Sequence, residues 1–262
     1  MTDPAVFYVY LSRGRVLLIG DGLEDDEHSH NALQVTINLH DGRFTLRQGE
    51  RQSEMSSAVI RPNVPHHVVS SDSWRAVLLL DAQTAHTHRI NQRFPALDGI
   101  EELPAEDVAF CQQLLRDFIG QAQPIERADT VIGAIIERLG GPLAHPAALD
   151  PRIEKTLTRI HQLEGRTLAL SDLAAHVHLS ESRLSHLFKQ EIGIPLQRYL
   201  LWYKVAQTAF NIGRGMSLTD AAIDAGFADS AHFSRTFRAM FGITPSQILR
   251  RSRFVRVISD RN

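Results

Sequence analysis

The spacing of hydrophobic and polar positions changes near residue 82. Before that point, short runs rich in Val, Ile, Leu and Tyr are separated by turn residues, a pattern typical of β-strands. It predicts strands at 6–11, 15–19, 33–39, 44–46, 58–60, 67–69 and 76–80. Asp41-Gly42, between two of these runs, is a strong hairpin signal. Short strands at such close spacing predict a small antiparallel barrel or sandwich.

After residue 82, apolar residues recur every three or four positions, which is the period of a helix that buries one face. Stripes of this kind predict helices over 106–119 and 129–139, and Gly140-Gly141-Pro142 ends the second. The following segment, 142–151, is rich in Pro and Ala and predicts a linker. We expect helices from there to about Arg251, and then a short apolar tail over 252–262.

One helical pattern occurs twice in the last third of the chain. Ser171-Asp172-Leu173-Ala174-Ala175 in the first copy corresponds to Thr219-Asp220-Ala221-Ala222-Ile223 in the second, at an offset of about 48 to 49 residues. Each copy continues through a tight turn into a second helix and so predicts a helix-turn-helix unit. In the first unit, we expect Ser171 and Ser180 to cap the two helices. A long helix over 196–211 could set the second helices of the two units about 34 Å, one turn of DNA, apart.

The second helix of each unit has a polar and basic outer face. In the first unit this face carries Ser182, Arg183, Ser185, His186 and Lys189, and in the second Ser230, His232, Arg235 and Arg238. Hydroxyl, imidazole and guanidinium groups can bond base edges in the major groove, and Lys or Arg can bind phosphates. These residues are therefore candidate contacts to double-stranded DNA.

The net charge of −2 hides two opposite halves. Residues 1–150 contain 12 Lys and Arg against 21 Asp and Glu, whereas residues 151–262 contain 16 against 9. A basic half that carries the repeated motif favours nucleic-acid binding. The single cysteine, Cys111, excludes an internal disulfide and fits a reducing compartment. No apolar run is long enough to span a bilayer, and the first residues carry no basic signal segment, so we expect a cytoplasmic protein without a membrane partner.

These features resemble the AraC/XylS family of bacterial transcription regulators over Arg152 to Arg251. The sharpest match is Gly226-Phe227, then Phe233-Ser234-Arg235-Thr236-Phe237-Arg238, then Phe241-Gly242-Ile243-Thr244-Pro245. The resemblance implies base contacts by Ser182, Ser185, His186, Ser230, His232 and Arg235, and phosphate contacts by Lys189 and Arg238. Two positions differ from the usual pattern: Ile248 stands where an aromatic residue is common, and His186 where Arg is common.

Two segments of the N-terminal part resemble the motifs of the cupin family. Gly22, His28, His30, Gln34 and Gly42 match the first motif, and Arg61 to His66 matches the second, with Asn63 where glycine is usual. In metal-binding cupins, two early histidines, a Glu and a late histidine converge, so the resemblance implies His28, His30, Gln34 and His66 as ligands of a divalent metal ion. Gln34 stands at the Glu position and is a neutral, weaker ligand. A pocket for an organic effector and a vestigial site are the alternatives.

We therefore predict an α+β protein with several domains. Residues 1–82 are expected to form a cupin-like antiparallel β-barrel that senses an effector, and 83–141 a helical region that dimerises. A linker over 142–151 leads to an all-α domain over 152–251 with two AraC-type helix-turn-helix motifs. Residues 252–262 form a C-terminal tail.

The predicted function is a sequence-specific DNA-binding transcription regulator, not an enzyme, controlled by a small molecule or metal ion in the barrel. Its expected partners are promoter DNA, a second copy of the chain and, for an activator, RNA polymerase. The alternative is a cupin metalloenzyme with an appended DNA-binding domain, and Gln34 in place of Glu argues against it. A third hypothesis is an architectural DNA-binding protein without a sensor, and the predicted N-terminal barrel argues against it.

Overall fold

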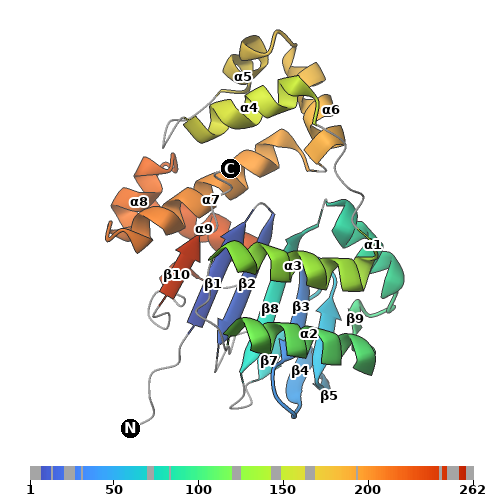
Figure 1. Ribbon diagram of the computed structural model, residues 1–262. Coiled ribbons are helices and arrows are strands. Elements are labelled where there is room, and N and C mark those ends of the chain that lie inside the picture. Colours follow the sequence, from blue (N-terminus) through green and yellow to red (C-terminus); the bar gives the residue numbers. More distant parts are fainter. Residues whose placement is uncertain are drawn as a thin grey trace.

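The structure is a computed structural model, and it describes residues 7–12, 14–20, 27–30, 32–69, 74–82, 84–119, 125–142, 149–162, 169–192, 194–241, 244–246 and 254–257. The β-rich N-terminal part carries helices on its faces, and the C-terminal helices lie against and above it (Figure 1). The described strands form a seven-stranded sheet with the order β10-β1-β2-β8-β3-β6-β9 and a three-stranded sheet with the order β5-β4-β7.

All seven strands predicted from the sequence are present. The strands are β1 Phe7–Ser12, β2 Arg15–Gly20, β3 Ala32–Asn38, β4 Phe44–Gln48, β5 Arg51–Met55, β6 Ser57–Ile60, β7 His67–Val69, β8 Arg75–Asp81, β9 Ile100–Glu101 and β10 Phe254–Val257. The pattern missed β5, because this strand pairs with β4 but carries mostly polar, exposed residues. It also missed β9 and β10.

Most of the strand pairs are antiparallel, as predicted, and β1 with β10 is a parallel pair. Within the described part of the chain, neither sheet closes on itself. The antiparallel N-terminal sheets are therefore confirmed, whereas a closed, cupin-like barrel stays a prediction. The C-terminal tail adds a strand to the edge of the large sheet, because Tyr8 pairs with Phe254 and Leu11 with Val257.

The helices predicted from apolar periodicity form close to their expected positions. The helices are α1 Ala85–Arg93, α2 Ala105–Ile119, α3 Ile125–Gly140, α4 Pro151–Gln162, α5 Leu170–His176, α6 Glu181–Ile192, α7 Leu196–Gly213, α8 Leu218–Asp224 and α9 Ser230–Phe241. The capping role predicted for Ser171 is wrong, because α5 already begins at Leu170 and its N-cap, Ala169, has no side-chain hydrogen bond. Ser180 caps α6 as predicted, since its Oγ accepts from the backbone N–H of Arg183 at 3.2 Å. No described helix is long and apolar enough to cross a membrane.

The large sheet is buried on both faces. Because side chains alternate along a strand, Tyr10, Leu17 and Ile19 lie on the face that α2 and α3 cover (Figure 1). There the ring of Tyr10 meets that of Phe118 edge-on, with centroids 5.2 Å apart. The intervening residues Val9, Val16 and Leu18 share a second core with residues of α7 and α9. Apolar positions on both faces explain why 15–19 reads as a continuous apolar run.

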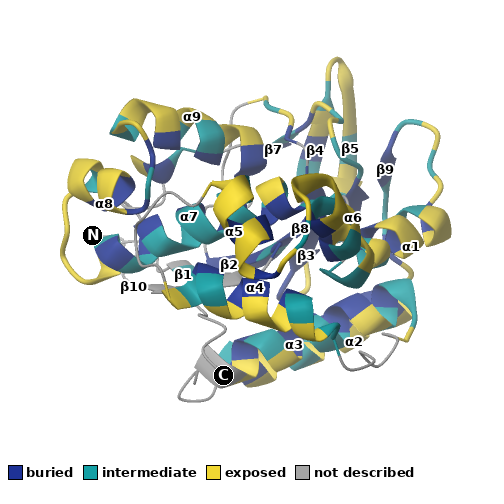
Figure 2. Ribbon diagram, turned by 90° about the horizontal axis from the view of Figure 1, so that it is seen from above, coloured by how far each residue is buried: buried dark blue, intermediate teal, exposed yellow. Residues whose placement is uncertain are grey.

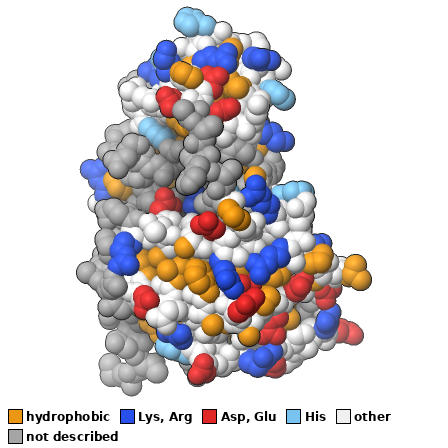
Figure 3. All heavy atoms as spheres, turned by 45° about the vertical axis from the view of Figure 1, so that its right-hand side comes forward, with side chains coloured by type: hydrophobic (Ala, Val, Ile, Leu, Met, Phe, Trp, Pro, Cys, Tyr) orange, Lys and Arg blue, Asp and Glu red, His pale blue; other side chains and the backbone are white. Residues whose placement is uncertain are grey.

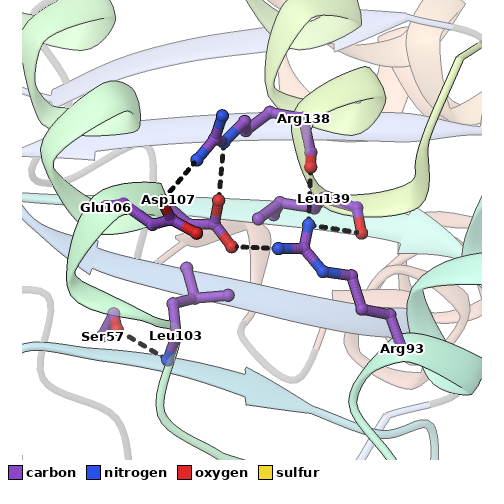
Figure 4. A network of polar contacts seen from close by, with 7 residues as sticks. All are labelled: Ser57, Arg93, Leu103, Glu106, Asp107, Arg138 and Leu139. Carbon is purple, nitrogen blue, oxygen red and sulfur yellow. Dashed lines mark hydrogen bonds and ion pairs between the residues drawn. The ribbon is translucent and has the colours of Figure 1, made fainter.

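A buried carboxylate holds α1, α2 and α3 together beside the sheet. Asp107 in α2 is completely buried and accepts hydrogen bonds from Arg93 of α1 and Arg138 of α3, each at 2.6 Å (Figure 4). Arg93 also donates to the backbone oxygen of Arg138 at 2.6 Å. The smaller sheet has its own core with β6, which includes Phe44, Leu46 and Ile60.

Candidate nucleic-acid interface and histidine cluster

The first helix-turn-helix unit consists of α5 and α6. Leu173, Leu184 and Phe188 form its buried core, and the ring of Phe188 meets Tyr199 of α7 edge-on at 5.3 Å. The turn places His178 in the left-handed region, with φ 55°, and the backbone N–H of Leu179 donates to the oxygen of Ala174 at 2.9 Å. These contacts hold α6 at a fixed angle to α5.

The second unit consists of α8 and α9, and a row of aromatic rings fills its core. Phe227, Phe233, Phe237 and Phe241 follow one another with centroid separations of 5.2, 5.6 and 4.5 Å. The turn needs a left-handed residue, which Gly226 supplies with φ 86°. Asp229 caps α9, because its Oδ1 accepts from the backbone N–H of His232 at 2.6 Å. The sequence pattern did not predict this cap.

The predicted DNA contacts lie on the outer sides of α6 and α9. Seven are exposed, namely Ser182, Arg183, His186, Lys189, His232, Arg235 and Arg238, while Ser185 and Ser230 are half-buried. Figure 2 shows the exposed residues on the outer sides of α5, α6, α8 and α9. Within the described part of the chain, Arg183, Lys189, Arg235 and Arg238 form no ion pair. Their positive charges are therefore available to a polyanion.

Helix α7 connects the two units. Its 18 residues correspond to a length of about 27 Å at 1.5 Å per residue. Lys204 of α7 donates to the backbone oxygen of Gly226 in the second unit at 3.0 Å, and Tyr199 packs in the first unit. The helix is therefore built into the cores of both units and fixes their separation.

Three histidines come together where the chain enters β3 and β7, because His28 and His30 precede β3 and His66 precedes β7. The ring centroids of His28 and His66 are 4.4 Å apart. The ring centroid of His30 lies 5.5 Å from that of His28 and 5.3 Å from that of His66. One ring nitrogen of each lies within 4.8 Å of the others. The three histidines predicted as metal ligands thus face a common point, and Gln34 reaches it through His30, whose Nε2 lies 2.9 Å from the Gln34 Oε1 atom.

Backbone pairing rather than one strand brings the histidines together. His28 and His66 exchange two backbone hydrogen bonds, of 3.0 and 2.9 Å, as an isolated β-bridge. The backbone N–H of Asn63 donates to the oxygen of His30 at 2.7 Å. Asn63 has φ 63°, a left-handed conformation that Gly or Asn adopts most easily, and this explains why Asn can replace the usual glycine of the motif.

The His66 ring is held with one nitrogen available. Its Nδ1 donates to the backbone oxygen of Val64 at 2.9 Å, while the buried Nε2 has no hydrogen-bond partner in the described part of the chain. Burial lowers the pKa of His66 from 6.5 to about 3, and burial also lowers the pKa of His30. Both rings are therefore neutral near pH 7, which is the form of imidazole that binds a metal ion.

Gln34 is buried and forms part of the same network. Its Nε2 donates to the hydroxyl of Thr36 at 2.9 Å, and the Nδ1 atom of His30 lies 3.1 Å from the backbone oxygen of Ala32. A neutral imidazole has one N–H, so His30 can donate either to Ala32 or to Gln34 but not to both. No local pattern indicated Thr36, Val64 or Ala32 as supporting residues.

Comparison with known proteins bears on the helical region. Residues 173–251 match the family model described as a helix-turn-helix domain. The arabinose operon regulatory protein of Escherichia coli is 31% identical over 105 residues, which cover 39% of this chain and 36% of that protein. The Msm operon regulatory protein of Streptococcus mutans is 25% identical over 122 residues, 45% of this chain and 43% of that protein. The match thus spans only about two fifths of these relatives' length.

A solved structure covers nearly the whole chain. The apo form of a ToxT variant from Vibrio cholerae aligns with a TM-score of 0.51 and 12% identity, over 92% of this chain and 99% of that one. At this identity the likeness establishes the fold alone. Together, the tandem geometry and the family match define the C-terminal part as a helix-turn-helix DNA-binding domain. Its relatives place it in the AraC type.

Proposed function

We propose that the chain is a sequence-specific transcription regulator that binds promoter DNA through both helix-turn-helix units. The observation that carries this proposal is the AraC-type domain with two exposed, basic outer faces joined by one rigid helix. In Figure 3, the upper part of the molecule, which holds α4 to α6, presents several Lys and Arg side chains. Relatives of this domain are regulatory proteins by name, and they include the arabinose operon regulatory proteins of Escherichia coli and Salmonella typhimurium.

In this proposal each residue type has its own task. Ser182, Arg183, Ser185 and His186 of α6 and Ser230, His232 and Arg235 of α9 contact base edges in successive major grooves. Lys189 and Arg238 bind phosphates and hold the register. Because these charges displace counterions from DNA, binding should weaken steeply as salt is raised.

Protection of DNA fragments from cleavage tests the proposal. The fragments include the region upstream of the protein's own gene, and the double variant Arg183→Ala/Arg235→Ala is compared with Arg47→Ala. Arg47 is an exposed arginine of β4, outside the helix-turn-helix units, and serves as the matched control. We expect a protected site for the unchanged chain and for Arg47→Ala, and its loss in the double variant. A site that survives in the double variant, or sequence-independent coating, contradicts the proposal.

We further propose that the N-terminal sheets form a cupin-like effector domain with a divalent metal ion at His28, His30 and His66. The buried, neutral rings of His30 and His66 support this, and so does the His66 Nε2 atom, which has no hydrogen-bond partner among the described residues. A buried nitrogen lone pair without a hydrogen bond is costly unless a ligand uses it. Three imidazoles suit first-row ions such as Zn²⁺. Gln34 would supply a neutral fourth oxygen ligand, and the backbone oxygen of Val64 fixes the orientation of the His66 ring.

Calorimetry with Zn²⁺ on the metal-free chain tests this site. His66→Gln removes one ligand, whereas His67→Gln changes the next residue, which lies outside the cluster, and serves as the control. We expect about one ion per chain for the unchanged protein and for His67→Gln. Affinity should fall at least about 10-fold in His66→Gln, since even a supporting residue is worth that much. Equal affinities in the two variants would exclude the site and favour an organic effector or none.

We also propose that the chain dimerises through α2 and α3. Figure 3 shows a band of hydrophobic side chains on the face that carries these helices. Phe110 of α2 is 40% exposed, and the Arg138 guanidinium lies 5.5 Å from its ring centroid. A dimer would bring four helix-turn-helix units to one promoter and raise the effective affinity.

A further inference from the structure

Strand β8 ends in a buried carboxylate that two side chains of α7 contact. The Oδ2 atom of Asp81 accepts from Arg198 Nε at 2.7 Å and from Trp202 Nε1 at 2.6 Å. Asp81 is completely buried, and Trp202 is only 3% exposed. The donors lie one helical turn apart, so one face of α7 is fixed to the end of this strand.

The same strand end is connected to the histidine cluster through a single residue of the neighbouring strand. In the large sheet Asp81 pairs with Ala32, the first residue of β3. The backbone oxygen of Ala32 lies 3.1 Å from His30 Nδ1, and the Ala32 methyl packs in the same core as Trp202. A chain of direct contacts thus runs from His30 through Ala32 and Asp81 to α7.

The position of Asp81 is determined by several elements at once. Its backbone N–H donates to the oxygen of Gly14, in the turn between β1 and β2, at 2.8 Å. Its backbone oxygen accepts from the hydroxyl of Thr87 in α1 at 2.8 Å. Because these bonds fix Asp81 to the sheet, its carboxylate cannot move with α7 alone. A displacement of the sheet at this point must therefore move α7 as well, or it must break the contacts of Asp81 with α7.

Apolar side chains of the sheet and of α7 also pack together in one core. Val9, Val16, Leu18 and Leu79 of the sheet share one core with Trp202 and Val205 of α7 and with Phe237 and Phe241 of α9. The second unit thus completes its core on the N-terminal sheet, whereas the core of the first unit consists of residues of α4 to α7 and the adjoining segments. Among the described residues, the sheet therefore shares a core with the second unit and with α7, and it shares none with α5 and α6 of the first unit.

We propose that Asp81 is the contact through which occupancy of the histidine cluster sets the position of α7, and so the separation of the two DNA-reading helices. An ion that binds His30 Nε2 would take this nitrogen from Gln34 and fix the ring proton on Nδ1, which then donates to the backbone oxygen of Ala32. A movement of the ring toward the ion would therefore pull on Ala32 and shift the start of β3 against Asp81. This inference rests on the proposed function, because it needs both metal binding and DNA binding. Since coupling is reciprocal, DNA would change the affinity for the ion by the same factor.

The experiment uses the full chain, Zn²⁺ as the probe and the DNA site found by footprinting. DNA affinity is measured with and without Zn²⁺ for the unchanged chain, Asp81→Asn, Trp202→Phe and the control Asp107→Asn. Asp107 is another buried carboxylate that pairs with arginines, but it contacts α1 and α3 rather than α7. Circular dichroism and Zn²⁺ calorimetry on each variant check that the fold and the cluster are intact.

We expect Zn²⁺ to change the DNA affinity of the unchanged chain and of Asp107→Asn by about 5- to 150-fold, the usual range for coupled sites. In Asp81→Asn and Trp202→Phe the change should shrink to less than about 2-fold while Zn²⁺ still binds. Full metal dependence in both variants overturns the proposal, as does a chain that binds Zn²⁺ and DNA independently. Independent binding of Zn²⁺ and DNA would leave the proposed function intact. A chain that binds no Zn²⁺, or that has no DNA site, would contradict the proposed function as well as this inference, and each is measured separately.

Discussion

The Nη2 atom of Arg93 lies 2.6 Å from Oδ2 of Asp107, which is completely buried in α2. Arg138 approaches the other carboxylate oxygen at the same distance, so one acidic residue joins three helices. Both arginine side chains keep more than a third of their surface exposed, at 37% and 36%. The arginine charges are therefore partly hydrated, and the buried carboxylate is the group that depends on the pairing.

Replacing Asp107 with Ala should lower the free energy of unfolding by about 2–4 kcal/mol, because it leaves two arginines without their partner and opens a small cavity. The control is Asp117→Ala on the exposed side of the same helix, which should change stability by less than about 0.5 kcal/mol. Urea unfolding followed by circular dichroism measures both. Equal effects of the two substitutions would show that the network does not hold the helices.

Arg235→Ala should weaken binding to the DNA site by about 1–3 kcal/mol and relax the preference at one base pair, because Arg can form two hydrogen bonds to a guanine edge. Arg238→Ala should weaken binding to all DNA sequences by a similar factor, and the slope of log affinity against log salt concentration should decrease by about 1. Binding to a set of single-base variants of the site at several salt concentrations separates the two roles. A uniform loss for Arg235→Ala would make it a phosphate contact.

Local patterns were sufficient to predict the elements whose burial is regular. The runs at 15–19 and 76–80 indicated strands because burial on both faces of the sheet makes them continuously apolar, and the stripe from Val108 to Phe118 indicated a helix because burial of one face leaves a clear period. The helix α1 was missed, since its buried residues are only Thr87 and Ile90 and most of the others are polar. The strand β10 was missed because its partner, β1, lies at the other end of the chain.

The site was predictable in part. The repeated motif identified the outer faces of α6 and α9, because the positions of the core residues determine which residues face outward. The spacing of His28 and His30 suggested two rings on one face. The bridge between His28 and His66 could not be predicted, because it joins residues that are far apart in the sequence and leaves no local pattern. Asp81 gave no signal at all: a single acidic residue after an apolar run is typical of a strand end, and its partners are 117 and 121 residues away.

Phe110→Glu should convert the proposed dimer to a monomer, because it places a charge in the middle of an apolar contact between α2 and α3 of two chains. Leu97→Glu is the matched control, since Leu97 is fully exposed but lies outside these helices. Sedimentation at several concentrations measures the dissociation constant, which should rise at least about 100-fold for Phe110→Glu, or roughly 3 kcal/mol. A chain that is monomeric without any substitution contradicts the proposed interface.

Acid should destabilise the metal-free chain partly through His66. Burial lowers the pKa of this ring from 6.5 to about 3 in the folded chain, whereas the unfolded chain binds the proton near 6.5. The unfolded state therefore holds more protons at any pH between these values. The contribution of the neutral ring is fully present above about pH 6.5 and is lost as the pH falls toward 3, by up to about 1.4 kcal/mol per pH unit. The pKa of His30 is also lowered by burial, so its effect has the same sign.

Urea unfolding of the chain in the presence of a chelator, between pH 7.5 and 5, measures this slope. His66→Gln removes the titrating ring, so its stability should fall less steeply with acid than that of the unchanged chain, even though the substitution lowers stability at every pH. The carboxylates titrate in both proteins and cancel in the difference between the two slopes. Added Zn²⁺ should steepen the dependence in the unchanged chain alone, because protons and the ion compete for the same nitrogens. Parallel curves for the two proteins would mean that the ring is not held neutral by the fold.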